Sequence, residues 1–165
     1  MKNSSQPPKL IWRVMRKLNQ RIARNYQRGI GPGSMVLLLT TTGRKSGLPR
    51  LTPLQYEGYE GVYYVGSARG QQADWFRNIQ ANPQVEVLVR RKRFSGLAEP
   101  ITDPKRIADF LEMRLRRHPL MIGALMRLEG LPLRHTRADL ERIAAGKALV
   151  IIQPIRDSSA PAYSE

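Results

Sequence analysis

Two hydrophobic periods divide the chain into strand-like and helix-like segments. Short apolar runs of β-rich residues end at Gly, Pro, Asn or Asp, and the run 85–89 alternates Val with other residues. Six strands are predicted, at 35–42, 50–56, 62–65, 85–89, 94–99 and 148–155. Glu57–Gly61 lies between two of these runs and is predicted to be a turn, with Glu57 and Glu60 in solvent.

Helical spacing accounts for most of the remaining chain. A short helix is predicted around Trp75, ended by Asn82-Pro83. Asp103 before Pro104 is typical of a helix start, and Pro119 separates that helix from a second one over about 120–129. Thr136 with Asp139 resembles a capping box opening a third helix. These three helices form a predicted helical insertion, 104–146, before the last strand.

The order of these elements predicts one α+β domain with flanking segments. Residues 31–156 are expected to form a six-stranded barrel with the insertion. Residues 1–30 are expected to hold a disordered lead and a basic amphipathic helix over 9–28, and 157–165 a flexible tail. Because the helix segregates apolar from basic residues, either it docks on the domain or it lies on an anionic membrane surface.

Charge narrows the range of partners. The 165 residues include 28 Lys and Arg against 13 Asp and Glu, a net charge of +15. Such a field favours polyanions: nucleic acid, anionic lipid or an acidic small molecule. No nucleic-acid-binding motif is visible, which disfavours the first of these. The chain has no run of about 18 apolar residues and no secretory signal, so a cytoplasmic location is expected, with peripheral membrane contact left open.

The side chains offer little catalytic chemistry of their own. Absence of cysteine excludes disulfides and thiolate metal sites, and His118 and His135 stand far apart without a carboxylate pattern that suggests a metal. No serine lies in a nucleophile elbow, and no carboxylates are paired for acid–base work. We therefore name no catalytic residue and expect a bound cofactor to carry any reaction.

A basic, glycine-containing turn is the best candidate for cofactor binding. Residues 40–50 read TTTGRKSGLPR, which is not a Walker A loop. Glycines permit positive φ, so backbone amides could converge on an anion, and the basic and hydroxyl side chains suit a phosphate. An ordinary basic hairpin turn is the alternative. The candidate residues are Arg44, Lys45, Ser46, Gly47 and Arg50.

A second candidate lies where the third strand leads through a glycine loop into the short helix. A helix N-terminus attracts anions and polar ring edges. Trp75 either stacks near a ring or belongs to the core. The candidates here are Ser67, Arg69, Gly70 and Trp75.

These strings carry a family resemblance. Residues 41–50 followed by Thr52-Pro53-Leu54 resemble one signature of the deazaflavin (coenzyme F-420)-dependent nitroreductase family, and 73–83 resemble its second. The match covers roughly 34–99. The resemblance implies a split β-barrel like that of FMN-binding reductases, with coenzyme F-420 as cofactor. Its phosphate and glutamate tail would meet Arg44, Lys45, Ser46 and Arg50, and its ring would lie near Thr52, Pro53, Leu54, Ser67 and Trp75.

The resemblance leads to a function with alternatives. It implies a reductase that transfers hydride from reduced coenzyme F-420 to a small electron acceptor: a quinone, an enone or a nitro compound. The alternatives are an FMN-binding reductase of the same fold, a nucleic-acid-binding module, or a membrane-surface module anchored by 9–28. Barrels of this kind often form dimers, so the resemblance also implies a homodimer.

Overall fold

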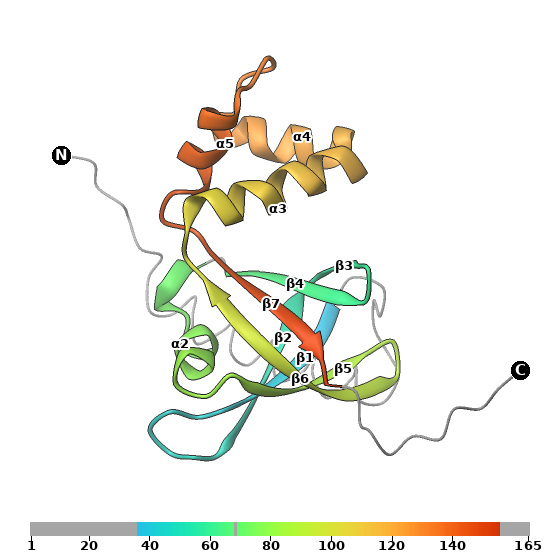
Figure 1. Ribbon diagram of the computed structural model, residues 1–165, viewed down its shortest axis with the longest axis vertical. Helices are drawn as coiled ribbons and strands as arrows, with labels where there is room; N and C mark the ends of the chain where they lie inside the picture. Colours follow the sequence, from blue (N-terminus) through green and yellow to red (C-terminus); the bar gives the residue numbers. More distant parts are fainter. Residues whose placement is uncertain (1–35, 68, 156–165) are drawn as a thin grey trace, which may run out of the picture.

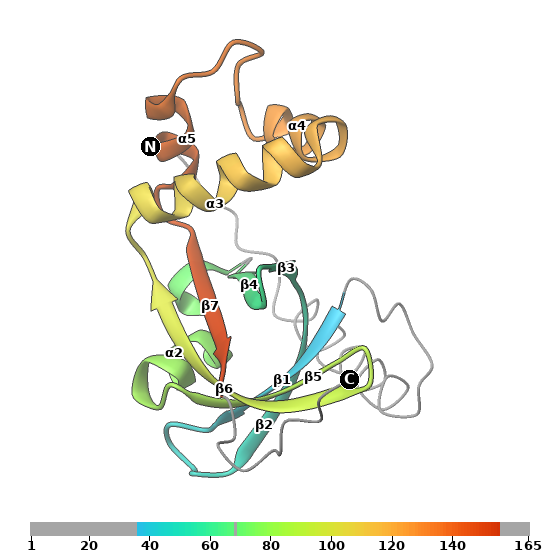
Figure 2. The same ribbon diagram turned by 45° about the vertical axis from the view of Figure 1, so that its right-hand side comes forward.

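A computed structural model of the chain describes residues 36–67 and 69–155. A curled antiparallel sheet occupies one end of this part, and three helices gather at the other end (Figures 1 and 2). The strands are β1 (Val36–Thr42), β2 (Pro49–Gln55), β3 (Glu57–Tyr59), β4 (Val62–Ser67), β5 (Gln84–Val89), β6 (Lys92–Ile101) and β7 (Ala148–Pro154). Their order in the sheet is β2-β1-β5-β6-β7-β4-β3. The helices are α2 (Asp74–Ala81), α3 (Pro104–Arg117), α4 (Pro119–Leu128) and α5 (Arg137–Ala144), with a 3-10 turn, η1, at Gly70–Gln72.

The inside of the curl holds the first hydrophobic core. The sequence alternation along β5 is confirmed, because Val85, Val87 and Val89 are all buried there. Helix α2 fits against the same core with Phe76 and Ile79, both almost fully buried. The helix predicted around Trp75 is thus confirmed, and it lies beside the curled sheet (Figure 1).

A second hydrophobic core lies between the sheet and helices α3, α4 and α5. Ile107, Leu111 and Ile122 are among its buried members. Strand β7 serves both cores: Val150 and Ile152 belong to the first, whereas Leu149 and the partly buried Ile151 pack into the second. This strand therefore joins the helical end to the sheet, as its path in Figure 2 makes visible.

The predicted helix starts of the insertion are confirmed. The Asp103 side chain accepts a hydrogen bond from the Lys105 backbone N–H at 3.0 Å and caps α3. Thr136 and Asp139 form the reciprocal capping box at the start of α5. Pro119 stands at the first turn of α4, so the chain begins a new helix there instead of continuing α3.

The prediction of six strands is wrong by one, since seven are present in the described residues. Glu57–Tyr59 pairs with Val62–Tyr64 as β3, where a turn was expected. The reversal needs only Glu60 and Gly61, both of which adopt positive φ, at 50° and 77°. A two-residue turn frees the preceding residues to pair, although Gly58 gives them little strand propensity.

The predicted lead, the amphipathic helix over 9–28 and the tail 157–165 lie outside the described residues, so these stay predictions. In the part of the chain that is described, no helix has the length and apolar character needed to cross a membrane.

The antiparallel pairing of β6 with β7 leaves no room for a side chain at Gly96. A Cβ there would lie 2.8 Å from Ile152 Cγ2 and 3.2 Å from the Gln153 carbonyl oxygen. Because Ile152 is fully buried, we expect Gly96→Ala to lower the free energy of unfolding by about 1–3 kcal/mol. Urea denaturation measures this. Gly66→Ala in β4 is the matched control, since a Cβ there meets no atom within 4 Å. Equal midpoints for the two variants would contradict the packing described here.

Candidate functional site

The basic turn between β1 and β2 closes on itself through glycine. The Gly43 N–H donates to the Leu48 carbonyl at 2.8 Å, and the Gly47 N–H donates to the Gly43 carbonyl at 2.7 Å. Gly47 has a φ of +66°. A Cβ on Gly43 would lie only 2.7 Å from Ser46 Oγ. Glycine is therefore favoured at both positions of this turn.

The expected cradle of backbone amides is not formed. The Arg44 N–H donates to Asn78 Oδ1 at 3.2 Å, and the Leu48 N–H donates to Ser46 Oγ at 3.3 Å. The amides of Gly43, Ser46 and Gly47 bond to carbonyls of the same turn. Because these N–H groups already have acceptors, an anion at this turn would be held mainly by side chains.

Arg44 is a structural clamp on α2. Its guanidinium donates to Asn78 Oδ1 at 3.1 Å and pairs with Asp74 Oδ1 at 3.1 Å. Asn78 is buried and donates in turn to Thr41 Oγ1 at 3.1 Å. Sequence reasoning missed Asn78; its signal is a polar residue between Phe76 and Ile79 of the helix's apolar face.

The other polar side chains of the turn remain available. Lys45 is exposed and makes no hydrogen bond or ion pair within the described residues. Arg50 is also exposed, and its Nη2 donates to Ser46 Oγ at 3.4 Å. Ser46 Oγ thus accepts two hydrogen bonds and keeps its own hydrogen to donate. Two cations and one hydroxyl donor suit a phosphate or a carboxylate.

The candidates that follow on β2 lie on an edge strand. Thr52, Pro53 and Leu54 are half-buried and pair with the apolar centre of β1. Leu54 packs against the core inside the curl. Proline is tolerated here because an edge strand leaves one side of its backbone without a ladder partner.

The loop before α2 is tightly folded. Ser67 Oγ donates to the Gly70 carbonyl at 2.6 Å, and Gly70 has a φ of +54°. A Cβ on Gly70 would lie 2.8 Å from the Gly146 carbonyl oxygen, which explains a glycine at this place. Arg69 is exposed at the start of η1, and the half-buried Trp75 contacts Phe76 edge-on, with ring centroids 6.1 Å apart.

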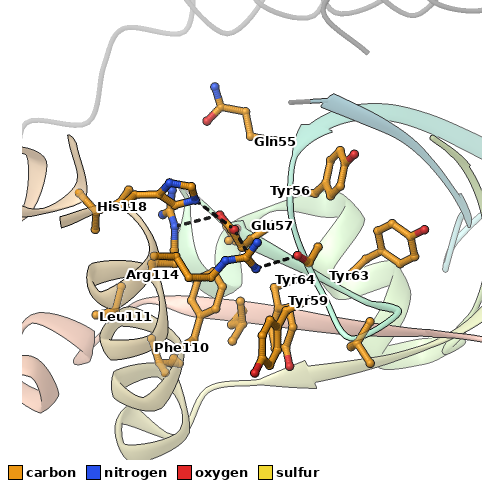
Figure 3. A pocket seen from close by; sticks show the side chains of 18 of the residues that line it. Gln55, Tyr56, Glu57, Tyr59, Tyr63, Tyr64, Phe110, Leu111, Arg114 and His118 are labelled. Atoms are coloured by element: carbon orange, nitrogen blue, oxygen red, sulfur yellow. Dashed lines mark hydrogen bonds and ion pairs between the residues drawn. The ribbon is translucent and has the colours of Figure 1, made fainter. Parts of the chain in front are cut away.

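A cavity of about 1000 Å³ opens between the β3–β4 hairpin and helices α3 and α4. Figure 3 shows its wall of aromatic and charged side chains. Ser67 and Gly70 line it, whereas the turn at 44–50, Thr52–Leu54 and Trp75 do not. The structure therefore separates Ser67 and Gly70, which line an open cavity, from the exposed basic turn and from the half-buried Thr52–Leu54 and Trp75.

Aromatic rings form one wall of the cavity. Tyr63 stacks on Phe94 with centroids 5.1 Å apart, and Tyr64 stacks on Phe110 at 5.4 Å. Tyr56 lies 5.7 Å from Tyr63 in a tilted arrangement. Sequence reasoning did not identify this wall, although four tyrosines within 56–64 were its signal.

Glu57 is the charged centre of the cavity, which corrects the expectation that it is solvated. Its side chain is 13% exposed and faces three basic groups. Its carboxylate oxygens lie 3.3 Å from Arg117, 3.3 Å from His118 Nε2 and 3.8 Å from Arg114 Nε. Arg114 Nε is buried without a hydrogen bond in the described structure. Since one carboxylate faces two arginines and a histidine, the cluster carries net positive charge (Figure 3).

Tyr59 completes the rim of the cavity. Its hydrogen bond to Glu60, together with the charge of that carboxylate, raises the pKa of the Tyr59 phenol, and the nearby Arg117 opposes this only in part. Arg117 lies over the ring at 5.4 Å from its centroid. The phenol therefore keeps its proton at neutral pH and can act as a donor.

Comparison with known proteins identifies relatives of this chain. Residues 10–120 match the family described as F420H(2)-dependent quinone reductase. Proteins with this name from Mycobacterium tuberculosis strains H37Rv and CDC 1551 / Oshkosh are each 40% identical over 68 residues. The aligned part is 39% of this chain and 46% of each relative, so it spans about half the length of these curated relatives.

Solved structures are similar in fold. A chain described as a domain-swapped dimer aligns with a TM-score of 0.51 and 19% identity, over 88% of this chain and 100% of its own. The heme storage protein of Vibrio cholerae aligns with a TM-score of 0.50 and 15% identity, over 87% and 89%. These likenesses concern the fold alone, whereas the family match covers well over half of the sequence and confirms the resemblance found in the two signatures. The chain belongs to the F420H(2)-dependent quinone reductase family, a family of oxidoreductases named for reduced coenzyme F-420.

Proposed function

We propose that this protein transfers a hydride from reduced coenzyme F-420 to a small quinone-type acceptor. The family match over 10–120, which includes the basic turn and α2, carries this proposal. Within the acceptors expected from the sequence, the family description favours a quinone over an enone or a nitro compound. An FMN-binding reductase of the same split-barrel class is the alternative.

The basic turn fits the acidic end of the cofactor. Lys45 offers an unengaged ammonium, Arg50 a guanidinium, and Ser46 one hydroxyl hydrogen. These donors match both a phosphate and a carboxylate tail. FMN has the phosphate but lacks the carboxylate tail. Arg44 contributes positive charge but is held by Asp74 and Asn78, so its first role is to fix the turn on α2.

Two groups of residues are proposed to hold the ring. Thr52, Pro53 and Leu54 offer a half-buried strand edge, and Trp75 an aromatic face. Ser67 donates its own hydrogen to Gly70, so toward a ligand its oxygen can only accept. That suits the N–H of a ring edge rather than a carbonyl.

The cavity beside Ser67 is proposed to receive the acceptor. Aromatic walls exclude water and stack on a planar ring, whereas the cationic cluster around Glu57 stabilises negative charge that develops on a quinone oxygen. When bound, the reduced cofactor supplies the hydride. The quinone then needs one proton, which solvent can supply at the rim, where Tyr59 is exposed.

We also propose that the protein forms a homodimer and is located in the cytoplasm. A homodimer agrees with the domain-swapped neighbour of similar fold. A cytoplasmic location rests on the sequence alone.

Lys45→Ala should weaken binding of coenzyme F-420 without changing stability. A charge-assisted bond to phosphate contributes about 1.5–3 kcal/mol, so the Kd should rise by one to two decades. Lys105→Ala, an exposed lysine at the start of α3, is the control. Fluorescence titration measures affinity and thermal melting measures stability. An unchanged Kd would show that the turn is only a basic hairpin.

Glu57→Gln should act on the acceptor rather than on the cofactor. Loss of the carboxylate leaves three basic groups facing one another, so we expect the free energy of unfolding to fall by about 1–2 kcal/mol. The KM for the acceptor should change, whereas the Kd for the cofactor stays constant. Glu86→Gln, an exposed carboxylate on β5 outside the cavity lining, is the control. If cofactor affinity falls instead, the cavity is not a separate acceptor site.

The choice of reductant tests the proposed reaction directly. Stopped-flow absorbance follows reduced coenzyme F-420 mixed with menadione and enzyme, in parallel with NADPH and reduced FMN. Turnover is expected with the deazaflavin alone. NADPH should fail because the sequence has no dinucleotide fingerprint. Reduced FMN should fail because it lacks the acidic tail that the basic turn would hold. Turnover with reduced FMN alone would keep the fold class and overturn the cofactor. No turnover, together with salt-sensitive DNA retardation, would overturn the enzyme proposal.

A further inference from the structure

Helix α4 is apolar on two opposite faces. Its inward face buries Ile122 and Met126 in the second core. Its outward face leaves Leu120 89% and Leu128 88% exposed, two turns apart on the same side. We call the exposed apolar residues of this region the α4 patch: Leu120, Met121, Leu125, Leu128 and Leu133.

Single exposed leucines need no explanation, but a group of five does. The patch accounts for half of the ten large hydrophobic residues exposed in the described structure. Helix α4, which carries four of the five residues, lies at the helical end of the molecule (Figures 1 and 2). Leu133, 76% exposed, extends the patch into the loop before α5.

The patch is accompanied by basic side chains that have no ion-pair partner among the described residues. Arg127 and Arg134 are exposed, and their side chains form no ion pair or hydrogen bond within the described residues. Glu129, the acidic residue between them, is engaged by Lys147. Leucines beside free arginines are the pattern of a surface that inserts apolar side chains among acyl chains and binds lipid phosphates.

We propose that the α4 patch docks this protein on an anionic membrane surface. This surface is separate from the segment 9–28. It would also place the cavity at the membrane, because Met121 and Leu125 belong both to the patch and to the cavity lining. That consequence rests on the proposed function: an acceptor dissolved in the lipid would reach the cavity without crossing water.

Vesicle binding of the full chain tests the docking without any enzyme assay. Partitioning is measured by co-sedimentation with phosphatidylcholine vesicles, with and without phosphatidylglycerol. The triple variant Leu120→Ser, Leu128→Ser and Leu133→Ser should lose at least about tenfold in binding to anionic vesicles. Leu97→Ser, a half-exposed leucine on β6, is the control and should bind as the wild type does. The leucines of the triple variant are mostly exposed, so its melting temperature should not fall.

A charge variant provides a second test that leaves the apolar residues in place. Arg127→Gln with Arg134→Gln should reduce binding to anionic vesicles by about twenty-fivefold at low salt, since each arginine near such a surface contributes about fivefold. Binding to neutral vesicles should be unchanged. Arg91→Gln with Arg93→Gln on the β5–β6 turn and β6 removes the same charge elsewhere and should have a smaller effect.

Unchanged vesicle binding by the triple variant would overturn the proposal. If the triple variant binds vesicles as the wild type does, another part of the chain carries any membrane contact. If the wild type is a dimer without lipid and the triple variant is a monomer with unchanged vesicle binding, the patch is an interface between copies. Because neither readout requires turnover, failure here is distinguishable from failure of the proposed reaction.

Discussion

The structure depends on β7 burying both of its faces. Most strands of a curled sheet have one face toward the core and the other toward solvent, but Val150 and Ile152 point into the curl while Leu149 packs under the helices. A continuous apolar run is the natural sequence for such a strand. The interaction holds the three helices against the sheet along β7, with Ile101 of β6 and Tyr64 of β4 packed beside it. Where the helices extend beyond β7, toward the β3–β4 hairpin, sheet and helices separate and the cavity begins.

The far side of that cavity is held together by charge. Glu57 on β3 connects the hairpin to Arg117 at the end of α3 and to His118 before α4. Arg117 adds a hydrogen bond to the Gly58 carbonyl at 2.8 Å. Partly exposed ion pairs stabilise far less than a buried apolar contact of the same extent. We therefore expect this wall to open more easily than the β7 side, which suits a cavity that must admit and release a small molecule.

The sequence predicts most of the elements because their signals are local. Alternation along β5, the Asp103 cap and the Thr136 capping box each involve residues within a few positions. The basic turn is predicted for the same reason. The cavity is not, because Glu57 and Arg117 are 60 residues apart and no periodicity connects them. Glu57 also precedes a glycine and lies three residues before a second glutamate, a context typical of a solvated turn. The short strand β3 was missed on the same grounds.

Arg44 and Lys45 show why composition alone cannot assign a site. The two residues are adjacent, equal in charge and part of one motif, so the sequence offers no reason to separate them. Their surroundings differ through one buried side chain: Asn78 accepts from both the backbone and the guanidinium of Arg44, and Asp74 takes the remaining charge. A ligand would have to compete with those bonds to recruit Arg44, whereas Lys45 would only lose hydration. Arg44 therefore fixes the basic turn against α2 through Asn78 and Asp74. Lys45 keeps its charge available for binding.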